Sequence, residues 1–197
     1  MKRIILFILV FLLIGCVYAS DFSKVTVNRV DFEIPNEYSL GDTMKGKYVY
    51  KDLTTFAILC VDDYLVGSYG GYYDIADDSR DLSIDGRPAT LLTMYNKYIQ
   101  KNVSYLYFPV NRSVYCICFQ GNDVNENISH IVESASESEM STDTFYGMLD
   151  EAYKAHEDRQ YLDTITKDYS DYVSKTNQHK DTSNDRLVKW YLLSHGR

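Results

Sequence analysis

Two runs of alternating side chains, separated by a short turn, dominate the middle of the chain. In the first run, 103–110, tyrosines alternate with Leu106 and Phe108; in the second, 113–120, Tyr, Ile and Phe alternate with Val and Cys. Period-two alternation is typical of a β-strand, and Asn111–Arg112 lies between the runs as the turn. The pattern predicts a β-hairpin over 103–120.

A short helix is predicted directly after this hairpin. Asp123, with Glu126 three residues later, has the pattern of a capping box, in which two N–H groups at the helix start are bonded reciprocally. The apolar residues that follow recur at i, i+3, i+4 and i+7: Ile128, Ile131, Val132 and Ala135. This single stripe predicts that the helix, 123–136, covers one face of a sheet.

Four further segments have the composition of strands. The first, 25–34, is interrupted by Asn28–Arg29 and stopped by Pro35, which predicts a bent strand. The other three are 47–51, 54–61 and 89–95. Together with the hairpin they predict an α+β domain over 24–138, an antiparallel sheet with a helix cover.

A helical extension, 141–197, is predicted after the polar residues 136–139. From Ser141 or Thr142, one helix carries Phe145, Leu149, Ala152 and His156 on one face, and a second helical stretch covers 161–173. A polar loop over 175–185 leads to a last apolar helix, 187–193. That helix either docks on the domain or meets a partner or a membrane surface.

Residues 1–19 have the pattern of a signal peptide, since Lys2 and Arg3 precede a short apolar run. Small residues before Ser20 fit cleavage after Ala19, whereas the run that ends in Cys16 resembles a lipobox and predicts a lipidated cysteine. An uncleaved anchor is the third alternative. The chain is expected to be secreted or extracytoplasmic, with a membrane contact only through this N-terminal lipid or anchor.

The chain is acidic, with 20 basic and 28 acidic residues and a net charge of -8. Without Lys2 and Arg3 the balance is 18 against 28, a net charge of about −10. Such a surface repels phosphate backbones, so no nucleic-acid partner is expected.

Three cysteines remain if Cys16 is removed: Cys60, Cys116 and Cys118. Cys116 and Cys118 lie on the same strand face, about 6.6 Å apart along it, so a disulfide between them would distort the strand. Cys60 can form a disulfide with either one across neighbouring strands. The alternative is three buried thiols that act as small apolar side chains.

Nineteen tyrosines are the most unusual feature of the composition. Tyr64, Tyr69, Tyr72 and Tyr73 share a ten-residue segment with three glycines, which predicts a loop, followed by a short helix near 77–82. Because such a loop needs no rings for its own stability, these tyrosines are predicted to bind a protein or carbohydrate partner at the cell surface. The alternative is that tyrosines serve the half-buried face of the sheet.

No catalytic or metal-binding motif is complete in the sequence. None of the four histidines belongs to a known ligand pattern, and a nucleophile built from Cys116 or Cys118 with His130 would be weak because burial keeps a strand thiol inert. A calcium-loop pattern begins at Asp123 but lacks its glycine and its last glutamate, and the acidic residues within 74–81 are irregularly spaced. No catalytic residue, metal or cofactor is therefore expected.

Three sequons give candidate glycosylation sites at Asn102, Asn111 and Asn127. The first two lie at the ends of the hairpin strands, where a glycan is accessible.

The order of three segments resembles a known family. Residues 30–38 read Val-Asp-Phe-Glu-Ile-Pro-Asn-Glu-Tyr, residues 84–86 read Ile-Asp-Gly, and the hairpin with its helix follows. Small extracytoplasmic domains of methanogenic archaea, similar in arrangement to the PsbP-like α/β sandwich, open with such a strand and continue with such a turn. Glu37 and Ala89 stand where those domains usually have glycine. The resemblance implies a sandwich fold outside the membrane over 24–138, and it implies no activity.

The expected function is that of a non-enzymatic binding or assembly module at the cell surface or in the extracellular space. The alternatives are an extracytoplasmic enzyme that uses Cys and His residues and a membrane-anchored lipoprotein adaptor. A pocket where polar groups converge would favour the enzyme, whereas an exposed 64–73 patch without a pocket would favour the binding module.

Overall fold

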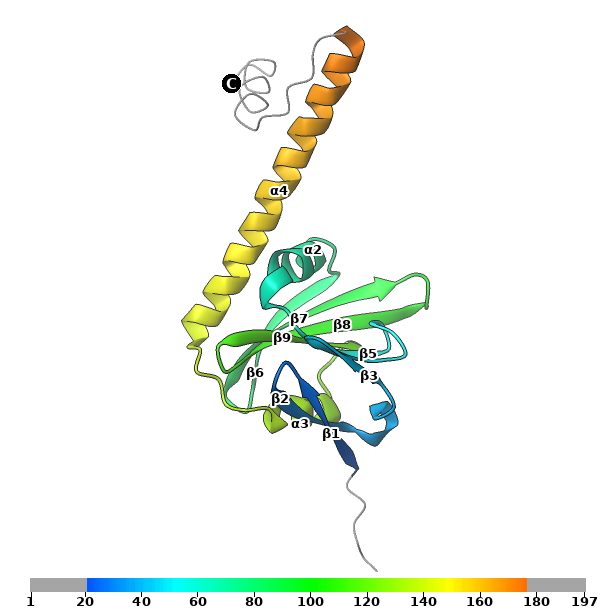
Figure 1. Cartoon of the computed structure of the whole chain (residues 1–197), viewed down its shortest axis with the longest axis vertical. Helices are drawn as coiled ribbons and strands as arrows, with labels where there is room; N and C mark the ends of the chain where they lie inside the picture. Colours follow the sequence, from blue (N-terminus) through cyan, green and yellow to red (C-terminus); the bar gives the residue numbers. More distant parts are fainter. Residues whose placement is uncertain (1–20, 177–197) are drawn as a thin grey trace, which may run out of the picture.

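A seven-stranded antiparallel sheet organises the structure, a computed structural model that describes residues 21–176 (Figure 1). In chain order the strands are β1 (Phe22–Val27), β2 (Val30–Pro35), β3 (Asp42–Met44), β4 (Lys47–Tyr50), β5 (Phe56–Cys60), β6 (Asp78–Ile84), β7 (Arg87–Asn96), β8 (Lys101–Val110) and β9 (Ser113–Gln120). The helical elements are η1 (Asn36–Tyr38), η2 (Asp62–Tyr64), η3 (Val66–Gly70), α2 (Gly71–Tyr73), α3 (Glu126–Ser134) and α4 (Thr142–Thr176). The protein is therefore α+β with a C-terminal helix, as the sequence predicts.

The strand order in the large sheet is β3-β4-β5-β9-β8-β7-β6. The predicted hairpin is confirmed as β8–β9, which pairs Leu106 with Ile117 at the centre of the sheet and turns at Asn111, whose φ is 53°. The two long central strands are buried on both faces, so each face of the sheet requires a covering layer.

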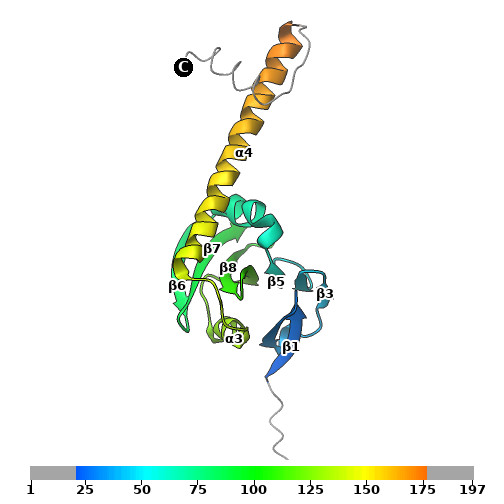
Figure 2. The same cartoon turned by 60° about the vertical axis from the view of Figure 1, so that its left-hand side comes forward.

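The first face is covered by α3 and by the β1–β2 hairpin, which lie together below the sheet in Figure 2. The predicted apolar stripe is confirmed, because all four of its residues are buried. The helix starts later than predicted: Asn125 is the N-cap and its side chain accepts the N–H of Ile128 at 3.0 Å. Asp123 instead binds Arg80 at 2.9 Å, an ion pair that holds the chain just before the helix on β6.

The segment predicted as one bent strand is the β1–β2 hairpin. Asn28 and Arg29 have φ of 47° and 69°, and two successive left-handed residues form the tight turn that joins antiparallel strands. The prediction was wrong because arginine rarely adopts this conformation, so Asn-Arg is a weak turn signal.

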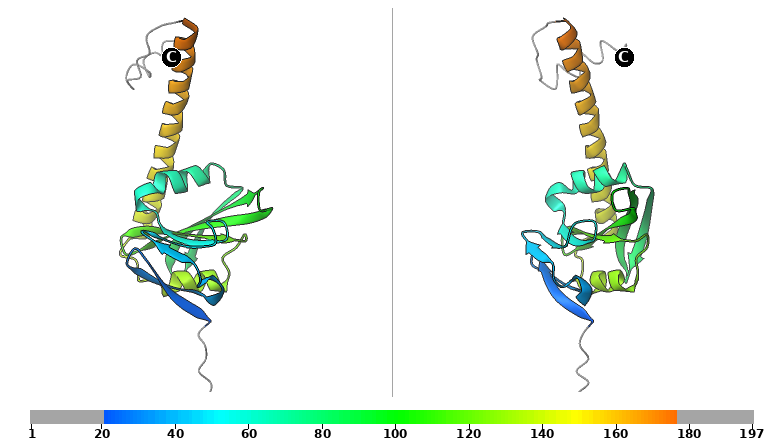
Figure 3. Two further views of the ribbon diagram at one scale, coloured as in Figure 1. Left: turned by 45° about the vertical axis from the view of Figure 1, so that its right-hand side comes forward. Right: turned by 90° about the vertical axis from the view of Figure 1, so that its right-hand side faces the viewer.

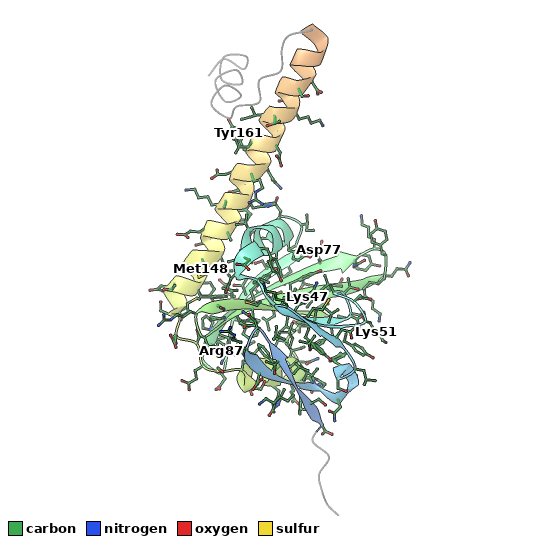
Figure 4. All side chains as sticks on the ribbon, viewed as in Figure 1. Lys47, Lys51, Asp77, Arg87, Met148 and Tyr161 are labelled. Atoms are coloured by element: carbon green, nitrogen blue, oxygen red, sulfur yellow. The ribbon has the colours of Figure 1, made fainter. Side chains whose placement is uncertain are left out.

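The second face is covered by the segment 62–73, above the sheet in Figure 3, and by the first half of α4, which begins beside the sheet. The predicted face of this helix is confirmed, since Phe145, Leu149 and Ala152 are buried. However, α4 is one helix of 35 residues and not two shorter ones. Figure 4 shows Met148 beside the sheet and Tyr161 on the part of α4 that projects beyond it. The start of the predicted extension is thus part of the core.

One smaller prediction is also corrected. Residues 78–84, predicted to include a short helix, form edge strand β6. The predictions for the signal peptide 1–19, for Cys16 and for the 187–193 helix lie outside the described residues.

Candidate functional site

The segment 62–73 is helical, so its prediction as a loop is wrong. Leu65 and Tyr69, four residues apart, are buried in the apolar cluster on the second face of the sheet. Gly70 permits a close approach to α4, because a Cβ at this position would lie 2.6 Å from the Cβ of His156. Packing against the sheet and α4 thus overrides the low helix propensity of glycine.

The four tyrosines of this segment do not form one exposed surface. Tyr69 is 5% exposed, and its ring meets that of Tyr107 edge-on at 5.2 Å. Tyr73 packs against a tyrosine of α4 with 4.9 Å between ring centroids. Tyr64 and Tyr72 line a pocket instead.

This pocket, of about 320 Å³, lies between the helical segment and the second face of the sheet. The side chains that line its interior include Ser68, Tyr72, Tyr105, Tyr107, Cys116 and Cys118. Tyr64, which is 44% exposed, and Lys47 of β4, labelled in Figure 4, also line it. The volume lies within the range of small-molecule sites.

Neutral aromatic rings form the walls of the pocket. The rings of Tyr72 and Tyr105 lie 4.2 Å apart, centroid to centroid. Burial raises the pKa of Tyr64 to about 12, and burial also raises the pKa of Tyr72 and of Tyr105. All three phenols therefore keep their protons at neutral pH, and the walls contribute no negative charge.

Two buried hydroxyls in the pocket lack hydrogen-bond partners among the described residues: those of Tyr107 and Ser68. Tyr107 is fully buried and Ser68 is nearly so. Burial raises the pKa of the Tyr107 phenol well above its ordinary value, and the adjacent Ser68 hydroxyl opposes this rise without the geometry of a hydrogen bond. A buried hydroxyl without a partner destabilises the fold, so it is an unusual feature that a ligand can satisfy.

Two thiols line the same pocket. The Sγ atoms of Cys116 and Cys118 are 4.0 Å apart, and both side chains are buried. Burial raises the pKa of the Cys116 thiol well above its ordinary value, which keeps it protonated and a poor nucleophile. The Tyr107 hydroxyl beside Cys116 acts in the opposite direction, because it stabilises the thiolate.

Of the two alternatives for the cysteines, the structure has free thiols and not a disulfide from Cys60 to Cys116 or Cys118: all three cysteines in the described part of the chain are free, with Cys116 and Cys118 buried and Cys60 half-buried. Cys60 is directly opposite Tyr115 in the β5–β9 pairing, and paired residues point to the same face. Cys116 and Cys118 point to the other face, so the sheet separates them from Cys60. Alternation within each strand was known from the sequence, but the register between strands was not.

The suggested Cys–His pair is not assembled either. His130 lies on α3, on the first face of the sheet, where its Nε2 is 2.9 Å from Glu33. His156 lies on α4, 3.5 Å from Asp74. The sheet separates His130 from Cys116 and Cys118, which line the pocket on the second face.

The acidic residues of 74–81 have separate structural roles. Asp77 accepts the backbone N–H of Tyr95 at 2.7 Å, and Asp81 accepts the Thr90 hydroxyl at 2.7 Å. Over residues 21–176, no three His, Cys, Asp or Glu side chains gather as a set of metal ligands would.

Two sequon asparagines, Asn111 and Asn127, are exposed. Asn102 is half-buried, its amide donates to Asn122, and the Ser104 of its sequon is fully buried. Glycosylation at the two exposed positions stays a prediction, whereas Asn102 is poorly placed to accept a glycan.

The sequence reasoning did not identify Ser68 and Tyr107 as site residues. A signal was present, because one face of the β8–β9 hairpin carries Tyr105, Tyr107 and both thiols, whereas the alternate face carries Leu, Phe and Ile besides Ser104 and Tyr115. Polar groups on a buried strand face require hydrogen-bond partners, whereas a strand that packs against an apolar layer needs only apolar side chains.

Fold and pocket together define an α+β protein whose central sheet forms one wall of a small, mostly apolar pocket. A scan against models of known protein families finds no match for this chain, and a search of curated proteins finds none. Among residues 21–176, no helix combines the length and the apolar composition needed to cross a membrane.

Proposed function

We propose that this chain is an exported, non-enzymatic binding protein that holds a small, mostly apolar molecule in the pocket between η3 and the sheet. One observation carries the proposal: the pocket is lined by two buried hydroxyls, those of Tyr107 and Ser68, without partners in the described structure. A ligand that bonds to them turns an unfavourable feature of the fold into binding free energy.

The lining defines the chemistry of the ligand. Aromatic rings such as those of Tyr72 and Tyr105 favour a flat or cyclic apolar body. The Tyr107 and Ser68 hydroxyls favour one hydrogen-bonding group on that body, such as a hydroxyl or a carbonyl. A neutral organic body is favoured where the ligand meets the buried rings, because an isolated charge would lose its hydration there.

By the criterion set from the sequence, a pocket with polar groups and no exposed 64–73 patch favours an enzyme. A non-enzymatic role is nevertheless supported by the state of the groups that line the pocket. Burial raises the pKa of Cys116, which makes its thiol a weak nucleophile. The histidines of the described chain bind carboxylates elsewhere, at Glu33 and Asp74. A general acid–base pair therefore has no support here.

Export is supported by the signal-peptide pattern of residues 1–19 and by the resemblance to extracytoplasmic domains. Cleavage after Ala19 would release the protein, whereas lipidation of Cys16 would hold it at the membrane surface. In both cases the pocket would bind molecules that are present outside the cell.

The proposal is tested with two matched probes, p-cresol and toluene, which differ by one hydroxyl. Calorimetric titration should show that p-cresol binds about fivefold more tightly than toluene, since one net hydrogen bond is worth about 1 kcal/mol. No binding of either probe by the wild-type protein would contradict the proposal.

A blocking variant shows where the probe binds. Gly67 lines the pocket, and a Cβ there meets nothing within 4 Å, so Gly67→Phe can fill the pocket without a clash at its own Cβ. Gly147→Phe on α4 is the matched control, because its Cβ also meets nothing within 4 Å and it does not line the pocket. Gly67→Phe should abolish p-cresol binding and Gly147→Phe should retain it.

A further inference from the structure

The thiols of Cys116 and Cys118 have a geometry that the proposed function does not use. Their sulfur atoms are 4.0 Å apart, they are buried, and they line the pocket. A metal–sulfur bond is about 2.3 Å long, so two such bonds span up to about 4.6 Å. One ion can therefore bond to both sulfurs from the pocket without a shift of the β9 backbone.

The number and type of ligands define the ion. Structural zinc takes four ligands, and calcium or magnesium takes six or more oxygens. The described chain brings no third His, Cys, Asp or Glu side chain to the pair. Thiolates select soft cations, and with two of them the fitting class is a soft monovalent cation such as Cu⁺, which accepts low coordination numbers.

Tyr107 provides a second, independent observation. This residue is opposite Cys116 in the β8–β9 pairing, and its fully buried hydroxyl has no partner among the described residues. When a monovalent cation binds, each thiol loses its proton to solvent and each sulfur forms one bond to the ion. The site then carries one net negative charge, which the Tyr107 hydroxyl can stabilise by donating a hydrogen bond to a thiolate.

We propose that Cys116 and Cys118 form a binding site for a soft monovalent cation, such as Cu⁺, in the wall of the pocket, with Tyr107 as its hydrogen-bond donor. This site goes beyond the proposed function, since it does not depend on an organic ligand in the pocket. Lys47 lines the same pocket, so its positive charge can offset part of the net negative charge of the metal-bound site.

The test is an anaerobic titration of the full chain with Cu⁺ in competition with a chromophoric Cu⁺ chelator. A Cys16→Ser, Cys60→Ser background removes the two other cysteines of the chain. This background protein should bind one equivalent. Adding Cys116→Ser or Cys118→Ser removes a metal ligand and should weaken binding by more than about 100-fold. Residues that hydrogen-bond to a metal ligand contribute about 10–100-fold, so Tyr107→Phe should weaken binding by about 10-fold.

Two results would overturn the site: no binding by the background protein, or equal binding after Cys116→Ser. A second measurement does not depend on whether the serine variants fold. Both thiols of the metal-free background protein are first alkylated with a small reagent over a time long enough for complete reaction. One equivalent of Ag⁺, a redox-stable soft cation, should protect both thiols over the same time, as mass spectrometry would show, and complete alkylation in the presence of Ag⁺ would refute the site. If the same sample bound p-cresol normally, that result would refute the metal site and leave the proposed binding function unaffected.

Discussion

The Tyr107 hydroxyl links the stability of the fold to the proposed binding function. Most buried polar groups have a partner, and one that has none costs about 1–3 kcal/mol of folding free energy. On the opposite face of the same hairpin, the buried Tyr115 hydroxyl donates to the backbone carbonyl of Val27 at 3.3 Å. The hairpin thus has two buried tyrosine hydroxyls, of which that of Tyr115 has a hydrogen-bond partner and that of Tyr107 has none among the described residues.

We predict opposite effects for the two matching substitutions. Tyr107→Phe should raise the free energy of unfolding by about 1 kcal/mol, because it removes a polar group without a partner. Tyr115→Phe should lower it by about 1 kcal/mol, because it leaves a hydrogen bond unmade. Urea unfolding measures both, and a loss of stability in Tyr107→Phe would mean that this hydroxyl has a partner in the free protein.

The pocket tyrosines also predict a response to alkaline pH. The pKa of Tyr64 is raised to about 12 by burial, above its ordinary value near 10. Its contribution to stability is therefore complete below about pH 10, and it is lost as the pH rises towards 12, because the unfolded chain ionises first. The wild-type protein should lose stability relative to Tyr64→Phe between about pH 9 and pH 11.

Denaturant unfolding of the two proteins at both pH values isolates this effect, since the other tyrosines are common to both. Tyr64 is 44% exposed, so solvent screens the effect and the predicted result is its direction. An unchanged difference between the two proteins would show that Tyr64 ionises equally in the folded and unfolded chains.

At the scale of elements, the contact between η3 and α4 depends on one glycine. A Cβ at Gly70 would lie 2.6 Å from the Cβ of His156 and 3.0 Å from the carbonyl oxygen of Ala152. Because these atoms belong to the helix itself or to the base of a side chain, α4 must shift to make room. Gly67, three residues earlier, has open space at its Cβ.

Alanine substitutions at these two glycines should therefore differ. Gly70→Ala should destabilise the protein by about 1–3 kcal/mol, the usual cost of overpacking. Gly67→Ala should be neutral or stabilising by up to about 1 kcal/mol, because alanine restricts the unfolded chain and favours a helix. Thermal unfolding of both variants measures the contrast, and equal stabilities would mean that η3 and α4 do not pack as described.

Elements whose signals are local were predicted well. The β8–β9 hairpin has alternation in both strands and a turn between them, and the apolar stripe is carried by Ile128, Ile131 and Val132 of α3 and by its C-cap residue Ala135. The segment 62–73 was missed because its helix is stabilised by the sheet and by α4, which its own glycines do not indicate. Local patterns report what a segment buries and not which neighbour covers it.

The candidate site was predicted in part for the same reason. Tyr64 and Tyr72 line the pocket, but as walls facing the sheet and not as an exposed patch. Ser68 and Tyr107 come from segments about forty residues apart, so their proximity follows from the topology alone. The cysteine pairing required the register of β5 against β9, which alternation within one strand cannot supply.

At the scale of the whole molecule, α4 has two parts with different roles. A helix of 35 residues is about 50 Å long, and Figure 1 shows its first part beside the sheet and its second part beyond it. Phe145 and Leu149 are buried in the cluster that includes the pocket thiols. The first part of α4 is therefore a structural layer of the domain.

This division predicts where the chain can be shortened. A protein that ends after Met140 loses the burial of Phe145 and Leu149, worth about 1.5–3 kcal/mol each, and also exposes the sheet beneath them. That loss is comparable with the 5–15 kcal/mol that stabilises a typical domain. The protein that ends after Met140 should therefore not show a cooperative unfolding transition. A protein that ends after Asp163 loses the buried Ile165, but it keeps Phe145 and Leu149 and also the hydrogen bond from Gln160 to Asp74 at 2.8 Å. It should unfold cooperatively in urea and bind p-cresol as the full chain does. Cooperative unfolding with an unchanged midpoint in the protein that ends after Met140 would contradict this division. The domain would then end before α4, and the second face of the sheet would be stable without its cover.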